Sequence, residues 1–279
     1  MITAEIDPQS MRNLNAAIGN FILQTGRDSD KVLKDQAKLF VKDLIKVTPP
    51  FGKATFSESY NEQRKAGEDA VERDIRKVFI PLRVFAESVS SRNPKLAAAI
   101  LAAGGIVGSN VKTKKSKVVK SAIDMDALDA IFRNMGMEGR VVRYVNPEIH
   151  QRARGRRGRV KRATPLFVVS EKSLDSYITS VKKDVGKAKS GWLKAAIGLG
   201  VAGIPNWIRR HLTPGVFVDK TLANNPEASI TVGNLVEYSG DFDAAKFEAA
   251  IQNRQRGMAN QLAKMAEHRA RKTNSGSTV

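Results

Sequence analysis

The sequence of 279 residues contains no cysteine, only three histidines and few aromatic residues. The missing thiols exclude a disulfide-bonded scaffold, thiolate zinc sites and cysteine nucleophiles. The histidines, His150, His211 and His268, lie far apart, and none stands at a helical metal-ligand spacing from another histidine or a carboxylate. No pair of acids lies in an apolar setting that would raise a pKa. We therefore expect no catalytic site, no metal site and no cofactor, and a protein that is not an enzyme.

The chain also lacks a long hydrophobic run. Its longest stretch of low charge, residues 96–111, is shorter than the roughly 20 strongly apolar residues that a membrane span needs. Residues 1–6 show none of the apolar core of a secretory signal. We expect no transmembrane helix and no membrane partner.

Acidic residues are scarce relative to basic ones. The 28 Asp and Glu residues face 47 Lys and Arg residues, which gives a formal charge of +19 and a pI near 10.2. A charge of this size does not select a fold. It favours phosphate backbones or anionic lipid as partners over neutral small molecules.

The positive charge is most concentrated between residues 152 and 162. Because charges leave water only when paired, we expect this segment to stay solvated. It has no interleaved aromatic residue for base stacking, so contact with DNA would be sequence-blind and salt-dependent. The other interpretation is a flexible basic loop that pairs with acids on a neighbouring subunit. The candidate contact residues are Arg152, Arg154, Arg156, Arg157, Arg159, Lys161 and Arg162.

Hydrophobic periodicity predicts a helix-dominated α+β fold, with a small antiparallel sheet flanked by long helices. Asp124 and Ser170 are predicted N-caps. No βαβ alternation, internal repeat or heptad array is evident. The predicted helices cover residues 8–25, 31–48, 67–79, 94–103, 125–132, 171–185, 192–199 and 242–272, and the predicted strands cover 141–145, 166–169 and 230–236.

Two short patterns resemble known sites but lack their context. Gly198, Gly200 and Gly203 have the spacing of a dinucleotide-binding loop, which requires a strand before it and a full helix after it. A helix is predicted before it instead, so a turn is favoured. Ser180 and Lys183 have the spacing of a serine–lysine pair without the partner motifs of that enzyme class, and they predict an exposed helix face.

Five short segments carry a resemblance to a known family. They are residues 47–50 (Val-Thr-Pro-Pro), 67–75, 190–192 (Ser-Gly-Trp), 205–211 (Pro-Asn-Trp-Ile-Arg-Arg-His) and 230–240. Together they are similar to the neck and tail-completion proteins of tailed bacteriophages, the minor tail or head–tail joining family. Trp192, Trp207 and Tyr238 lie in these segments, and the resemblance implies that they anchor the core or an interface.

The resemblance implies an organisation of the chain. Residues 1–26 would form an N-terminal helix or arm, and 27–50 plus 187–272 would form a small α+β core like that of neck proteins. Residues 51–186 would be a large insertion domain that contains the basic loop. The tail over 273–279, rich in small polar residues, is expected to be disordered.

The resemblance also implies a function. It predicts a structural virion protein of the head–tail junction, present in the host cytoplasm before assembly, which forms a homo-oligomeric ring around the DNA channel. Its partners would be further copies of itself, the head connector and tail tube proteins, and double-stranded DNA in transit. Charge alone favours an alternative, an independent, sequence-nonspecific nucleic-acid-binding protein that acts in packaging or condensation.

Overall fold

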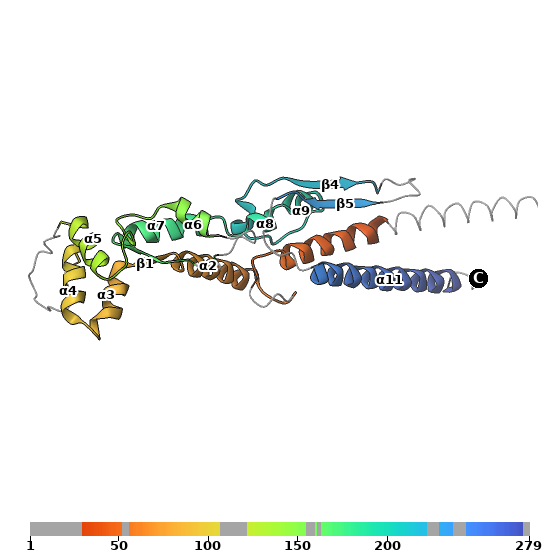
Figure 1. Ribbon diagram of the computed structural model, residues 1–279. Helices are drawn as coiled ribbons and strands as arrows, with labels where there is room; N and C mark the ends of the chain where they lie inside the picture. The colour runs from red at the N-terminus through yellow and green to blue at the C-terminus, as the bar shows by residue number, and fades with distance from the viewer. Residues whose placement is uncertain are drawn as a thin grey trace, which may run out of the picture. The chain divides into compact units, whose positions relative to one another are not determined.

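A computed structural model of the chain describes residues 30–51, 56–106, 122–154, 160, 163–221, 229–236 and 244–275 (Figure 1). Helices dominate this part and two small sheets accompany them, so the predicted helix-dominated α+β class is confirmed. The predicted helix over 8–25 and Tyr238 lie outside the described residues.

The chain divides into two compact units. The first consists of residues 1–63, 186–238 and 242–279, and the second of residues 64–185 with 239–241. The sequence-based division placed the start of the insertion at residue 51 and its end at residue 186. The first unit therefore also holds residues 51–63, which include a capping box at the start of a helix described below.

The first unit contains helices and one antiparallel pair of strands. A helix over residues 30–47 is followed, much later in the chain, by three short helices, two strands and a long last helix. Phe217 stands opposite Val232 in the strand pair, which is antiparallel as predicted, but of its two strands only the one over residues 230–234 was predicted. The elements are α8 (Lys187–Ser190), α9 (Leu193–Gly198), α10 (Asn206–Arg209), β4 (Gly215–Asp219), β5 (Ile230–Asn234) and α11 (Ala244–Ser275).

The helix over residues 30–47 packs against α11 in the antiparallel direction (Figure 1). Arg254 lies 2.9 Å from the Asp43 carboxylate, and Gln36 donates to Gln261 at 2.9 Å. Burial raises the pKa of Asp43, and the charge of Arg254 opposes that shift. Helix α11 extends to Ser275, so the predicted disorder from residue 273 is wrong for residues 273–275, and 276–279 lie outside the described residues.

The second unit is built around a three-stranded parallel sheet in the order β1-β3-β2. Phe79 stands beside Leu166, and Val141 stands beside Phe167. Parallel neighbours require crossover connections, which helices supply here, so the predicted absence of βαβ units is wrong for this unit. Its elements are α2 (Tyr60–Arg76, which starts in the first unit), β1 (Phe79–Pro81), α3 (Leu82–Ser90), α4 (Pro94–Ala103), α5 (Met125–Asn134), β2 (Val141–Val142), α6 (Pro147–Ala153), β3 (Leu166–Val168) and α7 (Glu171–Lys182).

Side-chain caps explain where several helices begin. Asp124 accepts a hydrogen bond from the Ala127 N–H at 2.9 Å, and Ser170 accepts one from the Ser173 N–H at 3.2 Å, which confirms both predicted N-caps. Helix α2 starts seven residues before the predicted position 67. Its start is a capping box, in which the Ser59 N–H donates to Glu62 at 2.8 Å and the Glu62 N–H donates to the Ser59 hydroxyl at 3.3 Å.

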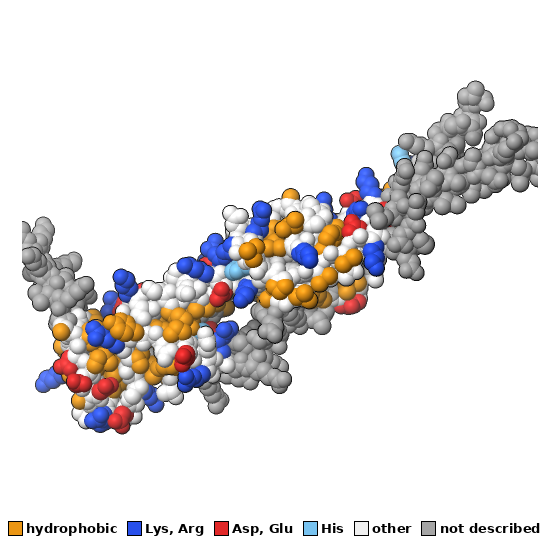
Figure 2. Space-filling model, turned by 90° about the horizontal axis from the view of Figure 1, so that it is seen from above, with side chains coloured by type: hydrophobic (Ala, Val, Ile, Leu, Met, Phe, Trp, Pro, Cys, Tyr) orange, Lys and Arg blue, Asp and Glu red, His pale blue; other side chains and the backbone are white. Residues whose placement is uncertain are grey.

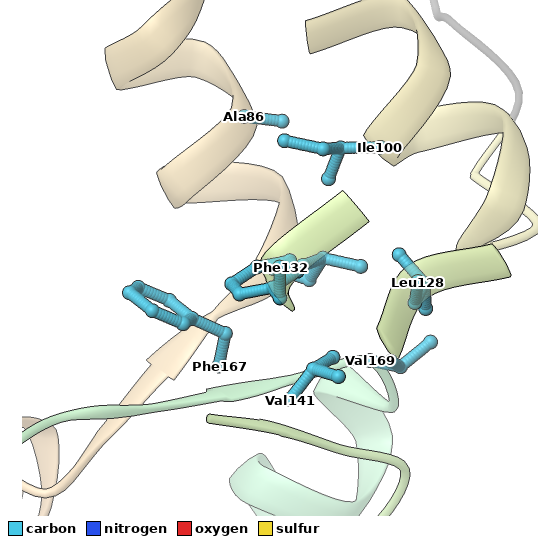
Figure 3. Close-up of a cluster of buried hydrophobic side chains, with 8 residues drawn as sticks. Ala86, Ile100, Leu128, Phe132, Val141, Phe167 and Val169 are labelled. Carbon is cyan, nitrogen blue, oxygen red and sulfur yellow. The ribbon is translucent and has the colours of Figure 1, made fainter. Parts of the chain in front are cut away.

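Two hydrophobic clusters hold the second unit together. Phe132 and Phe167 have ring centroids 5.3 Å apart in the cluster shown in Figure 3, and Phe85 lies over Phe167 at 4.1 Å. The cluster joins α3, α4 and α5 to one part of the sheet. A second cluster joins α2 and α7 to the sheet through Ile75, Phe79 and Leu174 among others. The end of the basic segment also packs into this second cluster.

Candidate nucleic-acid interface

The arginine-rich segment begins on α6 and continues beyond its end. Arg152 lies in α6, and Arg154 follows its last residue. Arg152 forms an ion pair with Glu148 at 2.8 Å, and both side chains are mostly exposed. An exposed pair at this spacing contributes only about 0.3–0.5 kcal/mol, so a phosphate group could replace it at small cost. The other five candidate contact residues lie outside the described residues: Arg156, Arg157, Arg159, Lys161 and Arg162.

The two ends of the segment are joined. Arg154 and Val160 form an isolated antiparallel bridge. The Val160 N–H donates to the Asp74 carboxylate at 2.8 Å, and the Val160 carbonyl accepts from the Lys77 ammonium at 3.2 Å. Asp74 lies in the last turn of α2 and Lys77 follows that helix. Asp74 and Lys77 therefore hold Val160 by both of its backbone polar groups, and the bridge joins Val160 to Arg154.

Val160 is also the hydrophobic anchor of the arginine-rich segment. It is only 2% exposed and lies in the second cluster, against which Ala153 packs as well. These two are the apolar residues of the segment 152–162. The expectation of a wholly solvated segment is therefore wrong at Val160, because its side chain gains from burial while its backbone groups find partners on α2.

A buried polar cluster lies beside Arg154 and Val160. The Nδ1 atom of His150 lies 2.8 Å from the Tyr177 hydroxyl, and its Nε2 atom lies 3.4 Å from the Asp74 carboxylate. Arg154 approaches the same carboxylate at 3.9 Å. A carboxylate attracts an N–H, so we assign the proton to Nε2 and make Nδ1 the acceptor for Tyr177. Asp74 thus accepts from the Val160 N–H with one oxygen and faces the histidine with the other.

The electrostatics of this cluster favour a structural role. Burial lowers the pKa of His150, although the hydrogen bond and charge of Asp74 act in the opposite direction. Burial also raises the pKa of Tyr177. The His150 side chain is only 4% exposed, so a substrate cannot reach the imidazole. Sequence spacing could not reveal the pair, since Asp74 and His150 lie on different elements far apart in the chain.

The first unit contains a buried lysine that the sequence did not single out. Lys189 is fully buried on α8, and its ammonium nitrogen donates to the carbonyl oxygens of Ile45 at 2.7 Å and of Thr48. A weaker contact of 3.4 Å reaches the carbonyl of Lys46, which also accepts from the Gln63 amide at 3.1 Å. These carbonyls lie at the end of the helix over residues 30–47.

Two prolines explain why these carbonyls need side-chain donors. In a continuing helix the carbonyls of Ile45 and Lys46 would accept from the N–H groups of residues 49 and 50. Those residues are Pro49 and Pro50, which have no N–H. Lys189 and Gln63 supply the missing donors from other parts of the chain. A buried carbonyl left without a donor costs about 1–3 kcal/mol, so this arrangement is a substantial part of the stability of the unit.

Burial lowers the pKa of Lys189 to about 7, while the charge of Glu58 opposes the shift. A neutral amine retains two N–H groups, which are enough for the two short bonds to Ile45 and Thr48. Perturbed lysines can be catalytic, but this one is fully buried, and its bonds go to the backbone of its own unit. We interpret it as a structural cap.

The segments that carry the family resemblance meet around this lysine. The Trp192 indole N–H donates to the Thr48 hydroxyl at 2.8 Å, which joins residues 190–192 to residues 47–50. Gly191 faces Asn234, and a Cβ atom on Gly191 would lie 1.8 Å from the Asn234 side-chain oxygen. Trp192 is 7% exposed. Residues 47–50, 190–192 and 230–234 are thus neighbours in space.

Trp207 is buried beside Gly186. Gly186 has a φ of +103°, and a Cβ atom there would lie 2.6 Å from the Trp207 ring. Both the backbone conformation and the tryptophan therefore require glycine at this position. The third anchor residue of the resemblance, Tyr238, lies outside the described residues.

The other patterns of the sequence have structural explanations. Helix α9 directly precedes Gly200 and Gly203, whereas a dinucleotide site would need a strand there. Ser180 and Lys183 lie on an exposed face of α7 and its C-cap, beside a hollow whose lining residues all come from that helix and its cap. Within the described residues, no group of histidines and acids could hold a metal ion, and no helix is long and apolar enough to cross a membrane.

Comparison with family models, curated proteins and solved structures finds no match for this chain.

Proposed function

We propose that this protein is a structural component of the head–tail junction of a tailed bacteriophage, where copies form a ring around the DNA channel and join the head connector to the tail. The observation that supports this proposal is the spatial convergence of residues 47–50, 190–192 and 230–234. These segments carry the resemblance to neck and tail-completion proteins, and they meet through the contacts of Trp192 with Thr48 and of Gly191 with Asn234.

In this proposal the second unit supplies the contact with DNA. Asp74 and Lys77 hold Val160, and the bridge joins Val160 to Arg154, so two described positions of the basic segment are held in place. A segment held at two positions loses less conformational entropy on binding than a free tail does. The segment contains no aromatic residue, so it would contact phosphates without reading the bases.

The test is to locate the protein in purified phage particles. Particle proteins would be identified by mass spectrometry, and antibody labelling in electron microscopy would show the position of the chain. We expect label at the junction of head and tail, and a ring of density there in averaged images. Absence of the chain from purified particles would refute the proposal.

The concentration of charge in the arginine-rich segment supports a second candidate, an independent, sequence-nonspecific nucleic-acid-binding protein for packaging or condensation. Titration of the isolated protein with duplex DNA at rising salt separates the two. A dedicated binder should bind tightly alone, with log K falling by about 0.9 for each phosphate contact per tenfold salt. A ring component should bind weakly before assembly.

Paired variants would assign any DNA binding that is found. Arg152→Gln combined with Arg154→Gln removes two described cations of the segment, and Arg83→Gln removes a half-exposed cation of α3 as a control. We expect the double variant to reduce the salt slope by about 2 and the control to leave it unchanged. Equal effects would assign the binding to total charge and not to the segment.

A further inference from the structure

The backbone that follows strand β2 is held on both sides of Tyr144. The Arg143 carbonyl accepts from the Ser170 N–H at 3.1 Å, and the Val145 N–H donates to the Ser173 hydroxyl at 3.1 Å. Both serines lie at the start of α7. The position of Tyr144 is therefore fixed by hydrogen bonds to another element, although its side chain lies at the surface.

Tyr144 is an aromatic side chain that folding leaves uncovered. It is 60% exposed, and between residues 85 and 196 it is the one exposed large hydrophobic residue within the described ranges. The Arg143 guanidinium lies over the ring, 5.4 Å from its centroid. Because the guanidinium occupies one face of the ring, the opposite face is the one available for stacking.

The pair of Arg143 and Tyr144 lies at the carboxyl edge of the parallel sheet. Val142 of β2 stands beside Val168 of β3, which stands beside Pro81 of β1, and these are the last residues of the three strands. The pair follows β2 directly. Ligands of open parallel sheets bind outside the carboxyl ends of the strands. The exposed pair thus lies where this kind of sheet binds ligands.

The charge of Arg143 is available to an anionic partner. In the view of Figure 2, basic side chains lie over the described surface, several of them beside acidic ones. Arg83, at the start of α3, is neutralised in this way, since Glu87 and Glu171 lie 3.4 and 3.6 Å from its guanidinium. Arg143, by contrast, forms no ion pair with any acid of the described ranges.

Helix α6 connects this pair to the described arginines of the basic segment. The helix begins at Pro147, three residues after Tyr144, and it carries Arg152 and is followed by Arg154. A helix of seven residues is about 10 Å long, which is about the length of three stacked nucleotides. One short strand could therefore contact both ends of α6.

We propose that Arg143 and Tyr144 bind an unpaired nucleotide of single-stranded nucleic acid. The base stacks on the open face of the Tyr144 ring, while Arg143, Arg152 and Arg154 supply positive charge to the phosphates. A base within a duplex is already stacked on both of its faces, so the ring takes an unpaired base. This inference rests on the DNA contact of the proposed function and adds a base-binding site to it.

A protein partner fits these surroundings less well. Tyrosine and arginine are frequent at the centres of protein interfaces, where the core of the contact is apolar and desolvated. The residues that follow Tyr144 at the surface are Asn146, Pro147 and Glu148, which are all exposed and mostly polar. An isolated aromatic ring beside cations favours a flat base joined to a phosphate.

Two single-stranded oligonucleotides test the proposal, one made of thymidines and one made of abasic nucleotides with the same number of phosphates. Fluorescence anisotropy at fixed salt would measure the Kd of the full chain for each. We expect the wild type to bind the thymidine strand roughly five- to a hundredfold more tightly, because stacking on an aromatic side chain stabilises a bound base.

Variants assign this preference to the pair. Tyr144→Ala should reduce the ratio of the two Kd values to about 1 without changing the Kd for the abasic strand, whereas Tyr144→Phe should keep the ratio because the ring remains. Arg143→Gln should weaken binding of both strands and reduce the salt slope by about 0.7. Arg83→Gln is the matched control and should change neither Kd, since Glu87 and Glu171 already neutralise Arg83.

Several outcomes would overturn the proposal. Equal wild-type affinity for the two strands, or no binding of either, would leave no role for the bases. A ratio retained in Tyr144→Ala would place the base elsewhere on the chain. A ratio lost in Tyr144→Phe would assign the preference to the hydroxyl and not to stacking. Circular dichroism would establish that all variants are folded.

A photochemical cross-link maps the contact directly. An oligonucleotide that contains 5-iodouracil, which joins to aromatic side chains on irradiation, should become attached to Tyr144, and mass spectrometry of the digested product identifies the residue. Attachment to other residues alone would contradict the proposal. These measurements use the isolated protein and single strands, whereas the proposed function is tested by the position of the chain in phage particles. The failure of either one is therefore seen separately from the other.

Discussion

Replacing Lys189 with methionine tests whether the end of the helix over residues 30–47 depends on donors from distant parts of the chain. Methionine keeps the length and most of the volume of lysine but donates no hydrogen bond. The Ile45 and Thr48 carbonyls would lose the Lys189 donor, while Lys46 would keep its bond from Gln63. At about 1–3 kcal/mol for each buried carbonyl, the loss in unfolding free energy is about 2–6 kcal/mol.

The assay can be confined to the first unit. The chain contains two tryptophans, Trp192 and Trp207, and both lie buried in that unit. Denaturant unfolding followed by tryptophan fluorescence therefore reports on this unit, and far-ultraviolet circular dichroism reports on the whole chain. Lys187→Met is the matched control, because Lys187 is exposed on the same short helix. It should change the unfolding free energy by less than about 0.5 kcal/mol.

The effect of Lys189→Met should also depend on pH. The pKa of Lys189 is about 7 in the folded chain, compared with an ordinary value of 10.5. Between these values the unfolded chain binds more protons, so the contribution of this group to stability rises with pH and is smallest below pH 7. The loss caused by Lys189→Met should therefore grow between pH 7 and pH 9, by up to about 1.4 kcal/mol for each pH unit.

A second substitution tests the role of the prolines. Pro49→Ala restores an N–H that could donate to the Ile45 carbonyl. In a double-mutant cycle, Pro49→Ala should offset part of the loss caused by Lys189→Met, by about 1 kcal/mol. A loss below 1 kcal/mol for Lys189→Met, or strictly additive effects in the cycle, would refute the assignment of Lys189 as the substitute donor.

Three further predictions concern the contacts of Asp74 and His150 and the convergence of segments around Trp192. Asp74→Ala should increase the rate of trypsin cleavage between residues 152 and 162 about ten- to a hundredfold, because the Val160 N–H loses a charged acceptor. Asp69→Ala, on the exposed side of α2, is the control and should leave the cleavage rate unchanged. The wild type should lose stability as the pH falls below about 6.5, since burial lowers the pKa of His150 and the unfolded chain then binds more protons. Thermal unfolding should show a shallower pH dependence for His150→Gln than for the wild type. Identical slopes would contradict the placement of His150. Gly191→Ala should reduce the unfolding free energy of the first unit by about 1–3 kcal/mol, because the added Cβ atom clashes with Asn234. Adding Asn234→Ala to the same chain should recover part of that loss. If it recovers none, the clash lies elsewhere.

Local signals in the sequence were sufficient to predict the fold class and the positions of many of the helices. The caps at Asp124 and Ser170 and the apolar spacing of α5 and α7 depend on residues three or four positions apart, which the sequence displays directly. The strands at 141–142 and 166–168 were also predicted, from β-branched and aromatic residues. The Ser59–Glu62 capping box was available in the sequence as well, and it would have placed the start of α2 correctly.

The sequence by itself determined the helix-dominated α+β class, the concentration of positive charge between residues 152 and 162, and the carbonyls that Pro49 and Pro50 leave without donors. Only the tertiary structure decided which side chains donate to those carbonyls and which groups hold the basic segment in place. Asp74 binds a backbone group 86 residues away, and Lys189 binds one 144 residues away. Side-chain periodicity reports on contacts within one or two helical turns. The contacts of Asp74 and Lys189 depend instead on how whole helices and strands pack, because that packing buries all their apolar faces together. The parallel order β1-β3-β2 and the antiparallel pairing of β4 with β5 arise in the same way, since strand neighbours exist only once the chain has folded.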